Sequence, residues 1–257
     1  MRVLATNDDG IEAPGLKVLR EIAAELSDDV WTVAPETDYS GAGHSLSLRD
    51  PVRMRKIDGR TYAVRGTPTD CVIMAVRHVM FDHRPDLILS GVNCGQNMAE
   101  DVTYSGTVAA AFEGTLLGIR SIAVSQSVGF REGRQPLWAT PKHLVPDLLR
   151  KLLKLEWPDN VLMNINVPDC TSEDVAGVLI TNQGRRDQAN IAIKEHKDAW
   201  GNPYYWLGFG RKISDPLPGT DLWAIRNGYI SVTPLSLNLT AKTMTNRLRD
   251  AGLEQEL

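Results

Sequence analysis

Short apolar runs alternate along the chain with segments in which apolar residues recur at helical spacing. The runs predict buried strands, because short apolar stretches bounded by polar or turn residues are typical of strands inside a parallel sheet. They lie at residues 2–5, 30–35, 86–90, 121–125, 161–167 and 229–234. Helices are predicted at residues 14–27, where apolar residues recur at helical spacing, and at 68–81, 105–117, 143–153 and 246–256. This alternation predicts an α/β fold with a mostly parallel sheet and helices on both faces.

Two segments interrupt the alternation. In residues 51–64, the Asp58-Gly59 pair predicts a tight turn and therefore a small hairpin inserted between the main units. Beyond Thr181 the chain is polar until the aromatic run Tyr204-Tyr205-Trp206, which predicts an extended hairpin arm. An exposed aromatic arm is a candidate contact between copies of the chain, and an ordinary antiparallel edge of the same domain is the alternative.

Composition restricts the class of protein. With 257 residues and 42% hydrophobic content, the chain is most simply one large domain. A formal charge of -4 gives no broad basic surface for a nucleic-acid duplex or a membrane. No apolar run approaches membrane-spanning length, and a strand that starts at Arg2 leaves no room for a signal peptide, so a cytoplasmic protein is expected. The widely spaced Cys71, Cys94 and Cys170 are expected to be free thiols.

The first apolar run leads directly into two adjacent carboxylates, Asp8 and Asp9. Because a helix is predicted to begin near Pro14, this acid pair lies on a strand-to-helix loop, where ligands bind in open α/β sheets. Negative charge at the end of a buried strand is costly without a cation nearby. The alternative is an Asn-Asp-Asp-Gly turn in which an aspartate caps the following helix.

Oxygen-bearing side chains follow two further predicted strands. Ser40 lies in the loop after residues 30–35, and Asn93 and Asn97 lie in the loop after residues 86–90. No histidine or cysteine accompanies the acid pair at ligand spacing. The set therefore favours one hard divalent cation, Mg²⁺ or Mn²⁺, over zinc.

A second motif, Tyr104-Ser105-Gly106-Thr107, begins the predicted helix over residues 105–117. Small hydroxyl residues around a glycine at a helix start allow backbone N–H groups to bind an anion, and the helix dipole favours negative charge there. The motif thus predicts a phosphate site. The alternative is a serine N-cap before an alanine-rich buried helix.

A cation beside a phosphate site predicts phosphomonoester hydrolysis, in which a metal-activated water attacks phosphorus. The chain contains no Gly-x-x-x-x-Gly-Lys-Ser/Thr loop and no dinucleotide-binding fingerprint, which argues against an ATPase or a dehydrogenase. In a rival mechanism, Asp8 or Asp9 is a covalent nucleophile. The acids are adjacent and no obvious lysine follows a later strand, so direct water attack is favoured.

Four segments together closely resemble the SurE (survival protein E) family. They are Thr6-Asn7-Asp8-Asp9-Gly10-Ile11, Tyr39-Ser40-Gly41-Ala42, Ser90-Gly91-Val92-Asn93-Cys94-Gly95-Gln96-Asn97 and Tyr104-Ser105-Gly106-Thr107-Val108-Ala109-Ala110-Ala111. The resemblance extends to about Pro234, and residues 221–225 with 228–234 look like the family's returning C-terminal strand. It implies a stationary-phase 5'-nucleotidase that acts on nucleoside monophosphates, with one divalent cation per subunit. It also implies a Rossmann-like three-layer α/β/α sandwich whose arm builds homodimers or homotetramers.

The resemblance assigns the segments and the site residues. It implies a core at about residues 1–180, an arm at about 181–227, and a returning strand and C-terminal helix at 228–257. The implied catalytic pair is Asp8 and Asp9, and the implied metal ligands are Asp8, Asp9, Ser40 and Asn93. The implied phosphate contacts are Asn97, Ser105, Gly106 and Thr107. A local departure at Gly43-His44 leaves the role of His44 in substrate choice open, and a non-catalytic sensor of metal and nucleotide is the alternative function.

Overall fold

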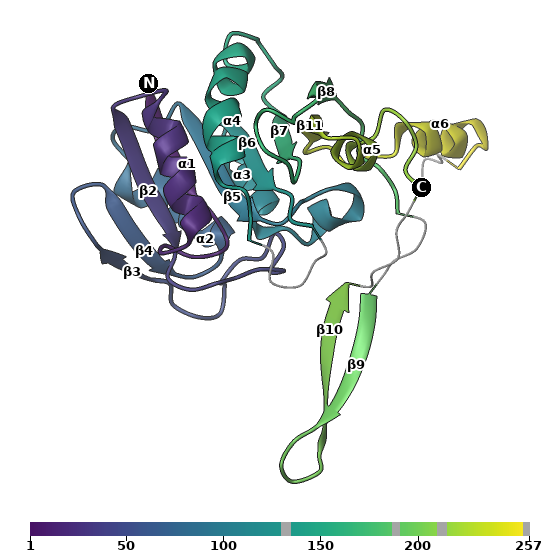
Figure 1. Ribbon diagram of the computed structural model, residues 1–257, viewed down its shortest axis with the longest axis horizontal. Helices are drawn as coiled ribbons and strands as arrows, with labels where there is room; N and C mark the ends of the chain where they lie inside the picture. Colours follow the sequence, from purple (N-terminus) through teal and green to yellow (C-terminus); the bar gives the residue numbers. More distant parts are fainter. Residues whose placement is uncertain (130–134, 187–190, 210–214, 254–257) are drawn as a thin grey trace.

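In the computed structural model, which describes residues 1–129, 135–186, 191–209 and 215–253, a nine-stranded sheet lies at the centre (Figure 1). Its strands in chain order are β1 (Arg2–Thr6), β2 (Asp29–Pro35), β3 (Arg53–Lys56), β4 (Thr61–Arg65), β5 (Leu87–Cys94), β6 (Arg120–Gln126), β7 (Val161–Val167), β8 (Gly177–Ile180) and β11 (Tyr229–Ser236). The spatial order is β3-β4-β2-β1-β5-β6-β7-β11-β8. Neighbouring strands are parallel except for β3 with β4 and β7 with β11. The predicted mostly parallel sheet is confirmed.

Helices cover both faces of the sheet. One face packs against α1 (Pro14–Ala24) and α4 (Ala139–Leu152), and the other packs against α2 (Pro68–Met74), its π-helical continuation η1 (Ala75–Val79) and α3 (Gly106–Leu116). Strand β1 contributes to both faces: Val3 and Ala5 belong to the core with α1 and α4, and Leu4 belongs to the core with α2, η1 and α3. Alternate side chains of a strand point to opposite faces, and here both faces are apolar. The three-layer α/β/α architecture is therefore confirmed.

The C-terminal third differs from the prediction in three elements. Strand β8 was not predicted, and residues 221–225, which were expected to belong to a returning strand, form α5 (Asp221–Arg226). The Thr220 side chain accepts a hydrogen bond from the Trp223 N–H, and this N-cap starts a helix instead of a strand. The final helix, α6, spans Lys242–Asp250, so it begins earlier and ends earlier than the predicted 246–256, of which residues 254–256 lie outside the described part of the chain. Gly252, with φ of 69°, supplies the left-handed residue that ends it.

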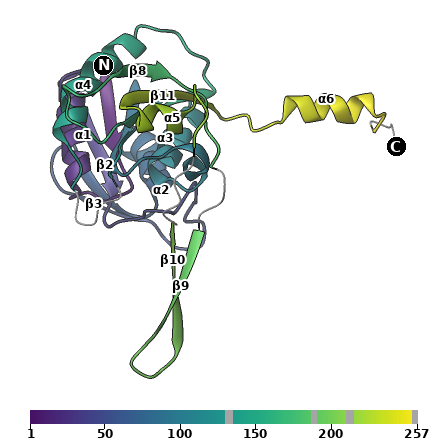
Figure 2. The ribbon, with the colours of Figure 1, turned by 45° about the vertical axis from the view of Figure 1, so that its right-hand side comes forward.

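The predicted arm contains a hairpin, β9 (Ile191–Lys197) and β10 (Pro203–Phe209), which is a separate two-stranded sheet. It projects away from the body of the protein in Figure 1. Helix α6 has no buried residue, and Figure 2 shows it extending from the body to the right, in a different direction from the hairpin. Within the described ranges, no helix is both long and apolar enough to cross a membrane.

Candidate functional site

The acid pair lies where three neighbouring strands end. Strand β1 pairs in parallel with both β2 and β5, so the loops that follow these strands meet at one edge of the sheet. Hydrogen bonds fix the loop after β2 against the acid pair: the Tyr39 N–H donates to the Asp8 carbonyl at 2.8 Å, and the Ile11 N–H donates to the Pro35 carbonyl at 2.8 Å. Ser40 directly follows Tyr39. The structure thus confirms that the loops of Ser40 and Asp8 are neighbours.

Asp8 is held by the first turn of α3. Its side chain is buried with 3% of its surface exposed, and the Thr107 hydroxyl donates a hydrogen bond to Asp8 Oδ1. Burial raises the pKa of Asp8, the hydrogen bonds from Thr107 act to lower it, and nearby Asp38 raises it further. The helix approaches closely because Gly106 has no side chain: a Cβ there would lie 2.8 Å from Asp8 Cβ. Glycine at this position therefore allows the close contact between α3 and the acid pair.

Asp9 carries the strongest indication of a cation. Burial, followed by the charge of Asp8, raises the pKa of Asp9 from an ordinary 3.8 to about 6, and a backbone hydrogen bond from Cys94 opposes the rise. Its Oδ2 atom is buried and has no hydrogen-bond partner among the described residues. An unpaired carboxylate oxygen in a buried site costs free energy that a bound cation would offset. Asn93 was predicted in the loop after residues 86–90, but it lies with Cys94 at the end of the longer strand β5. Because Cys94 follows Asn93, the same contact brings Asn93 next to the acid pair.

The remaining candidate ligands supply neutral oxygens. The Asn93 Nδ2 group donates to the Gly95 carbonyl at 2.8 Å, which leaves the Asn93 amide oxygen for another partner. Ser40 is exposed, and its backbone N–H donates to Asp38 Oδ1 at 2.7 Å. No three His, Cys, Asp or Glu side chains gather as a metal cluster in the described part of the chain. Two carboxylates with hydroxyl and amide oxygens fit Mg²⁺ or Mn²⁺, which take few protein ligands and keep several waters.

Asp38 was not predicted from the sequence. Its charge raises the pKa of both Asp8 and Asp9, so three carboxylates contribute negative potential at this edge of the sheet. The signal was available, because Asp38 lies in the same polar loop as Ser40. A local excess of negative charge further favours a bound cation.

Asn97 is fixed by hydrogen bonds from two strands. Its N–H donates to Asn166 Oδ1 at 2.8 Å, and its carbonyl accepts from Asn164 Nδ2 at 2.8 Å and Asn166 Nδ2 at 3.0 Å. Its own Nδ2 donates to Ser125 Oγ at 2.9 Å. These supporting residues were not predicted as part of the site. The available signal is the pair of asparagines at alternate positions within the otherwise apolar strand β7.

The predicted phosphate turn has structural partners of its own. The Ser105 side chain caps α3, because its Oγ accepts from the Val108 N–H at 3.0 Å. Thr107 is fully buried, and both its hydroxyl and its backbone hydrogen-bond Asp8. The structure therefore places Ser105, Gly106 and Thr107 beside the acid pair, as expected. It adds that Thr107 supports the Asp8 carboxylate, while a phosphate contact at this turn stays a prediction.

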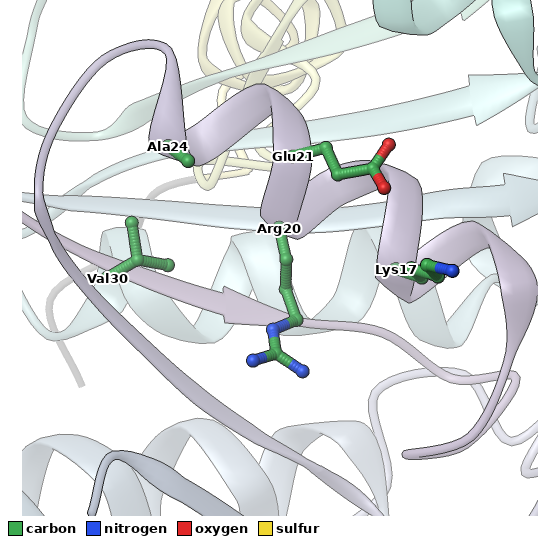
Figure 3. A pocket seen from close by; sticks show the side chains of 5 residues that line it. All are labelled: Lys17, Arg20, Glu21, Ala24 and Val30. Carbon is green, nitrogen blue, oxygen red and sulfur yellow. The ribbon is translucent and has the colours of Figure 1, made fainter.

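One cavity adjoins this site and another is remote from it. One, of about 350 Å³, adjoins Ser105 and is lined by Phe112 and by His44, whose Nε2 lies 3.0 Å from Glu113 Oε2. The other, of about 430 Å³, lies against α1 and the start of β2 (Figure 3). Since β2 begins at the opposite end of the sheet, the second cavity is remote from the acid pair.

Comparisons with known proteins show which family the chain resembles. The sequence profile of the family described as Survival protein SurE matches residues 3–190. A protein of Chelativorans sp. named 5'-nucleotidase SurE is 60% identical over 252 residues, covering 98% of this chain and 99% of that protein. A protein of the same name from Parvibaculum lavamentivorans is 57% identical over 251 residues, covering 98% of this chain and 91% of that protein.

The fold agrees with a solved structure as well. The crystal structure of SurE protein from Aquifex aeolicus matches with a TM-score of 0.81 and 39% sequence identity, covering 98% of this chain and 100% of that one. The family profile covers more than half of the chain, and the relatives align over nearly its whole length. The chain belongs to the SurE family.

Proposed function

We propose that this protein is a metal-dependent phosphatase that hydrolyses nucleoside 5'-monophosphates to nucleoside and phosphate. The observation that carries the proposal is the acid pair, in which Asp8 is buried, the buried Asp9 Oδ2 atom has no hydrogen-bond partner among the described residues, and the N-terminus of α3 lies alongside. Relatives named 5'-nucleotidase SurE, at 54–60% identity, support the substrate class. Nucleoside 3'-monophosphates and short polyphosphate are further candidate substrates.

The residue roles follow from the donor chemistry. Asp8, Asp9, Ser40 and Asn93 would hold one divalent cation, Mg²⁺ or Mn²⁺. When bound, the cation would neutralise charge on the phosphate and lower the pKa of a water nucleophile. The predicted phosphate site, by which we mean Asn97 with Ser105–Thr107, would orient the phosphate at the positive end of the α3 dipole.

The surroundings of Asp8 support attack by water over a covalent phosphate on Asp8. The Thr107 hydroxyl and backbone both hydrogen-bond the Asp8 carboxylate, and Gly106 packs directly against it. A carboxylate held in this way is a poor nucleophile, because its charge is stabilised and its approach to phosphorus is obstructed. The same contacts suit a metal ligand, whose orientation must be fixed by the residues around it.

The deciding experiment is phosphate release from a panel of 5'- and 3'-nucleoside monophosphates and short polyphosphate. The protein is first stripped with EDTA, and Mg²⁺ or Mn²⁺ is then added back. Release that depends on the added metal and is fastest with 5'-monophosphates is the expected result. Nucleotide binding without release would overturn the enzyme and favour a non-catalytic metal- and nucleotide-binding sensor.

A further inference from the structure

The loop that contains Asn97 is hydrogen-bonded to residues from both ends of the arm (residues 181–227). Asp221 lies near the C-terminal end of the arm, where it is the first residue of α5, and it is fully buried. Its Oδ2 accepts from the Ala99 N–H at 2.9 Å. Its Oδ1 accepts from the Gly184 N–H at 2.9 Å and from the Leu222 N–H at 2.7 Å. The Asp221 carboxylate therefore accepts hydrogen bonds from the start of the arm, from its end and from the Asn97 loop.

Ala99 needs this support. Its φ of 52° is in the left-handed region, which a residue with a side chain adopts at a cost and keeps only when its surroundings fix it. Both of its backbone polar groups are bound by the arm, since the Gln183 Nε2 donates to the Ala99 carbonyl at 2.9 Å and Asp221 accepts from its N–H. Ala99 lies two residues after Asn97 and is fully buried.

The arm also contacts the next two residues of the same loop, Glu100 and Asp101. The Arg186 N–H donates to the Glu100 carboxylate at 3.1 Å, and the Arg186 guanidinium forms an ion pair with Asp101. Burial raises the pKa of Asp101 while Arg186 opposes the rise, as expected for a half-buried ion pair. Residues 99–101 are thus bonded to the arm one after another. Nothing in the hydrolytic role of Asp8 and Asp9 requires these contacts.

We propose that Asp221 is a positioning residue for the phosphate site. Asn97 is held from one side by strands β6 and β7, through Ser125, Asn164 and Asn166. From the other side, Asp221 fixes the backbone of Ala99 and so sets the position of Asn97. A displacement of the arm is transmitted through this contact to the phosphate site. The proposed metal ligand on the same segment, Asn93, is less affected because it lies within β5, paired with Ser125 of β6. The inference rests on the proposed function, because it assigns Asn97 to phosphate.

The variant Asp221→Asn isolates the contact. An asparagine whose amide oxygen replaces Oδ1 keeps the bonds from Gly184 and Leu222, but its NH₂ group opposes the Ala99 N–H. The matched control is Asp215→Asn, which makes the same chemical change at an arm carboxylate that is 97% exposed. Three quantities are compared in each protein: kcat and KM with a nucleoside 5'-monophosphate, the inhibition constant of inorganic phosphate, and the affinity for Mn²⁺.

In Asp221→Asn, we expect kcat/KM to fall about 10- to 100-fold, which is the range for a misplacement of about 1 Å in a binding group. The inhibition constant of phosphate should rise with it, while Mn²⁺ affinity stays within about twofold, because a change at one site has little effect on a separate site that shares no partners with it. Asp215→Asn should match the wild type. Unchanged phosphate inhibition, or a Mn²⁺ affinity that falls in parallel, would overturn the positioning role, because a general loss of structure affects both sites.

A rescue experiment tests the mechanism itself. Glycine adopts a left-handed φ without strain, so Ala99→Gly in the Asp221→Asn background should recover most of the lost phosphate affinity. Failure of this rescue, together with normal folding, would show that Asp221 does not act through Ala99. A wild-type protein that neither releases phosphate nor binds inorganic phosphate would overturn the proposed function as well. Wild-type turnover with unaltered Asp221→Asn kinetics would overturn only the positioning role.

Discussion

At the residue scale, the site balances function against stability. Asp9 combines a buried unpaired oxygen with a neighbouring carboxylate, and both features disfavour its ionised form. A site of this kind is maintained at a cost to the metal-free fold, as is usual where function requires charge in a buried place. The cost should be visible when the charge is removed without changing the shape of the side chain.

Asp9→Asn should therefore separate activity from stability. We expect metal-dependent turnover to fall at least about 1,000-fold, because a ligand and its charge are lost. The metal-free variant should be more stable than the metal-free wild type at pH 8, by about 1–2 kcal/mol after allowance for partial exposure of Asp9. Thermal unfolding with and without Mn²⁺ measures both effects. Full activity in the variant would refute the assignment of Asp9 to the metal.

The same residue predicts a pH dependence. The pKa of folded Asp9, about 6, lies above its ordinary 3.8, so protons bind the folded state more tightly than the unfolded state. Its contribution to the stability of the metal-free protein is thus fully present below pH 3.8 and is lost as the pH rises through about 6. Protons also compete with the cation, so Mn²⁺ affinity should weaken as the pH falls below about 6. Titration of Mn²⁺ affinity between pH 5 and 8 checks this, and a flat profile would contradict it.

Thr107 tests whether the first turn of α3 serves the carboxylate or the phosphate. Loss of the hydroxyl in Thr107→Val removes a hydrogen bond that lowers the pKa of Asp8, so that pKa should rise. We expect weaker Mn²⁺ binding near neutral pH and a turnover about 10- to 100-fold lower, with Thr107→Ser retaining most of both. If the inhibition constant of phosphate changes while Mn²⁺ affinity does not, the hydroxyl contacts phosphate instead.

At the scale of elements, the site depends on the close approach of α3 to the loop after β1. A Cβ on Gly106 would lie 2.8 Å from Asp8 Cβ and 3.0 Å from Pro68 Cγ, distances at which the helix must shift. Gly106→Ala should reduce kcat/KM more than 10-fold by displacing the helix start from the acid pair. Gly59→Ala is the matched control, because a Cβ at Gly59 meets nothing within 4 Å. Equal kinetics in the two variants would show that the close approach is not needed.

The elements that could be predicted from sequence are those whose apolar pattern is local. The strands at β1 and β7 follow from short apolar runs, since each is buried on both faces. Strand β8, by contrast, alternates between half-buried and exposed residues and is only four residues long, so its pattern is too weak to identify. Helix α5 depends on a single N-cap at Thr220 within a short apolar segment, which is equally typical of a strand.

The candidate site divides in the same way. Asp8 and Asp9 could be identified because two adjacent acids after an apolar strand are unusual in themselves. Asn164 and Asp221 could not, because their roles depend on hydrogen bonds to Asn97 and Ala99, which are distant in the chain. A buried polar residue within an apolar strand shows that a partner is needed, but the sequence does not identify that partner.

At the scale of the whole molecule, two parts extend from a well-packed body. The hairpin β9–β10 and helix α6 both project from the body (Figures 1 and 2). The hairpin exposes Trp206 at 63% and Leu207 at 72%, and α6 exposes Met244 at 51%. A large apolar side chain exposed on a projecting element is typical of a surface that packs against another chain. We therefore expect the protein to form homodimers or homotetramers in which the arm is covered.

Trp206→Glu should disrupt this assembly. A charge placed within an apolar contact between subunits costs several kcal/mol, enough to shift an assembly at micromolar concentration toward smaller species.

The control is Phe81→Glu, which changes an aromatic residue of similar exposure, 69%, on the body of the protein. Sedimentation velocity should show a dimer or tetramer for the wild type and for Phe81→Glu, and a smaller species for Trp206→Glu. Because the hairpin is a separate sheet, the body should keep its secondary structure by circular dichroism in all three proteins. The unfolding temperature should fall only in Trp206→Glu, because assembly stabilises the folded state. A wild type that sediments as a monomer at high concentration would show instead that the arm serves another purpose, such as covering the site of its own chain.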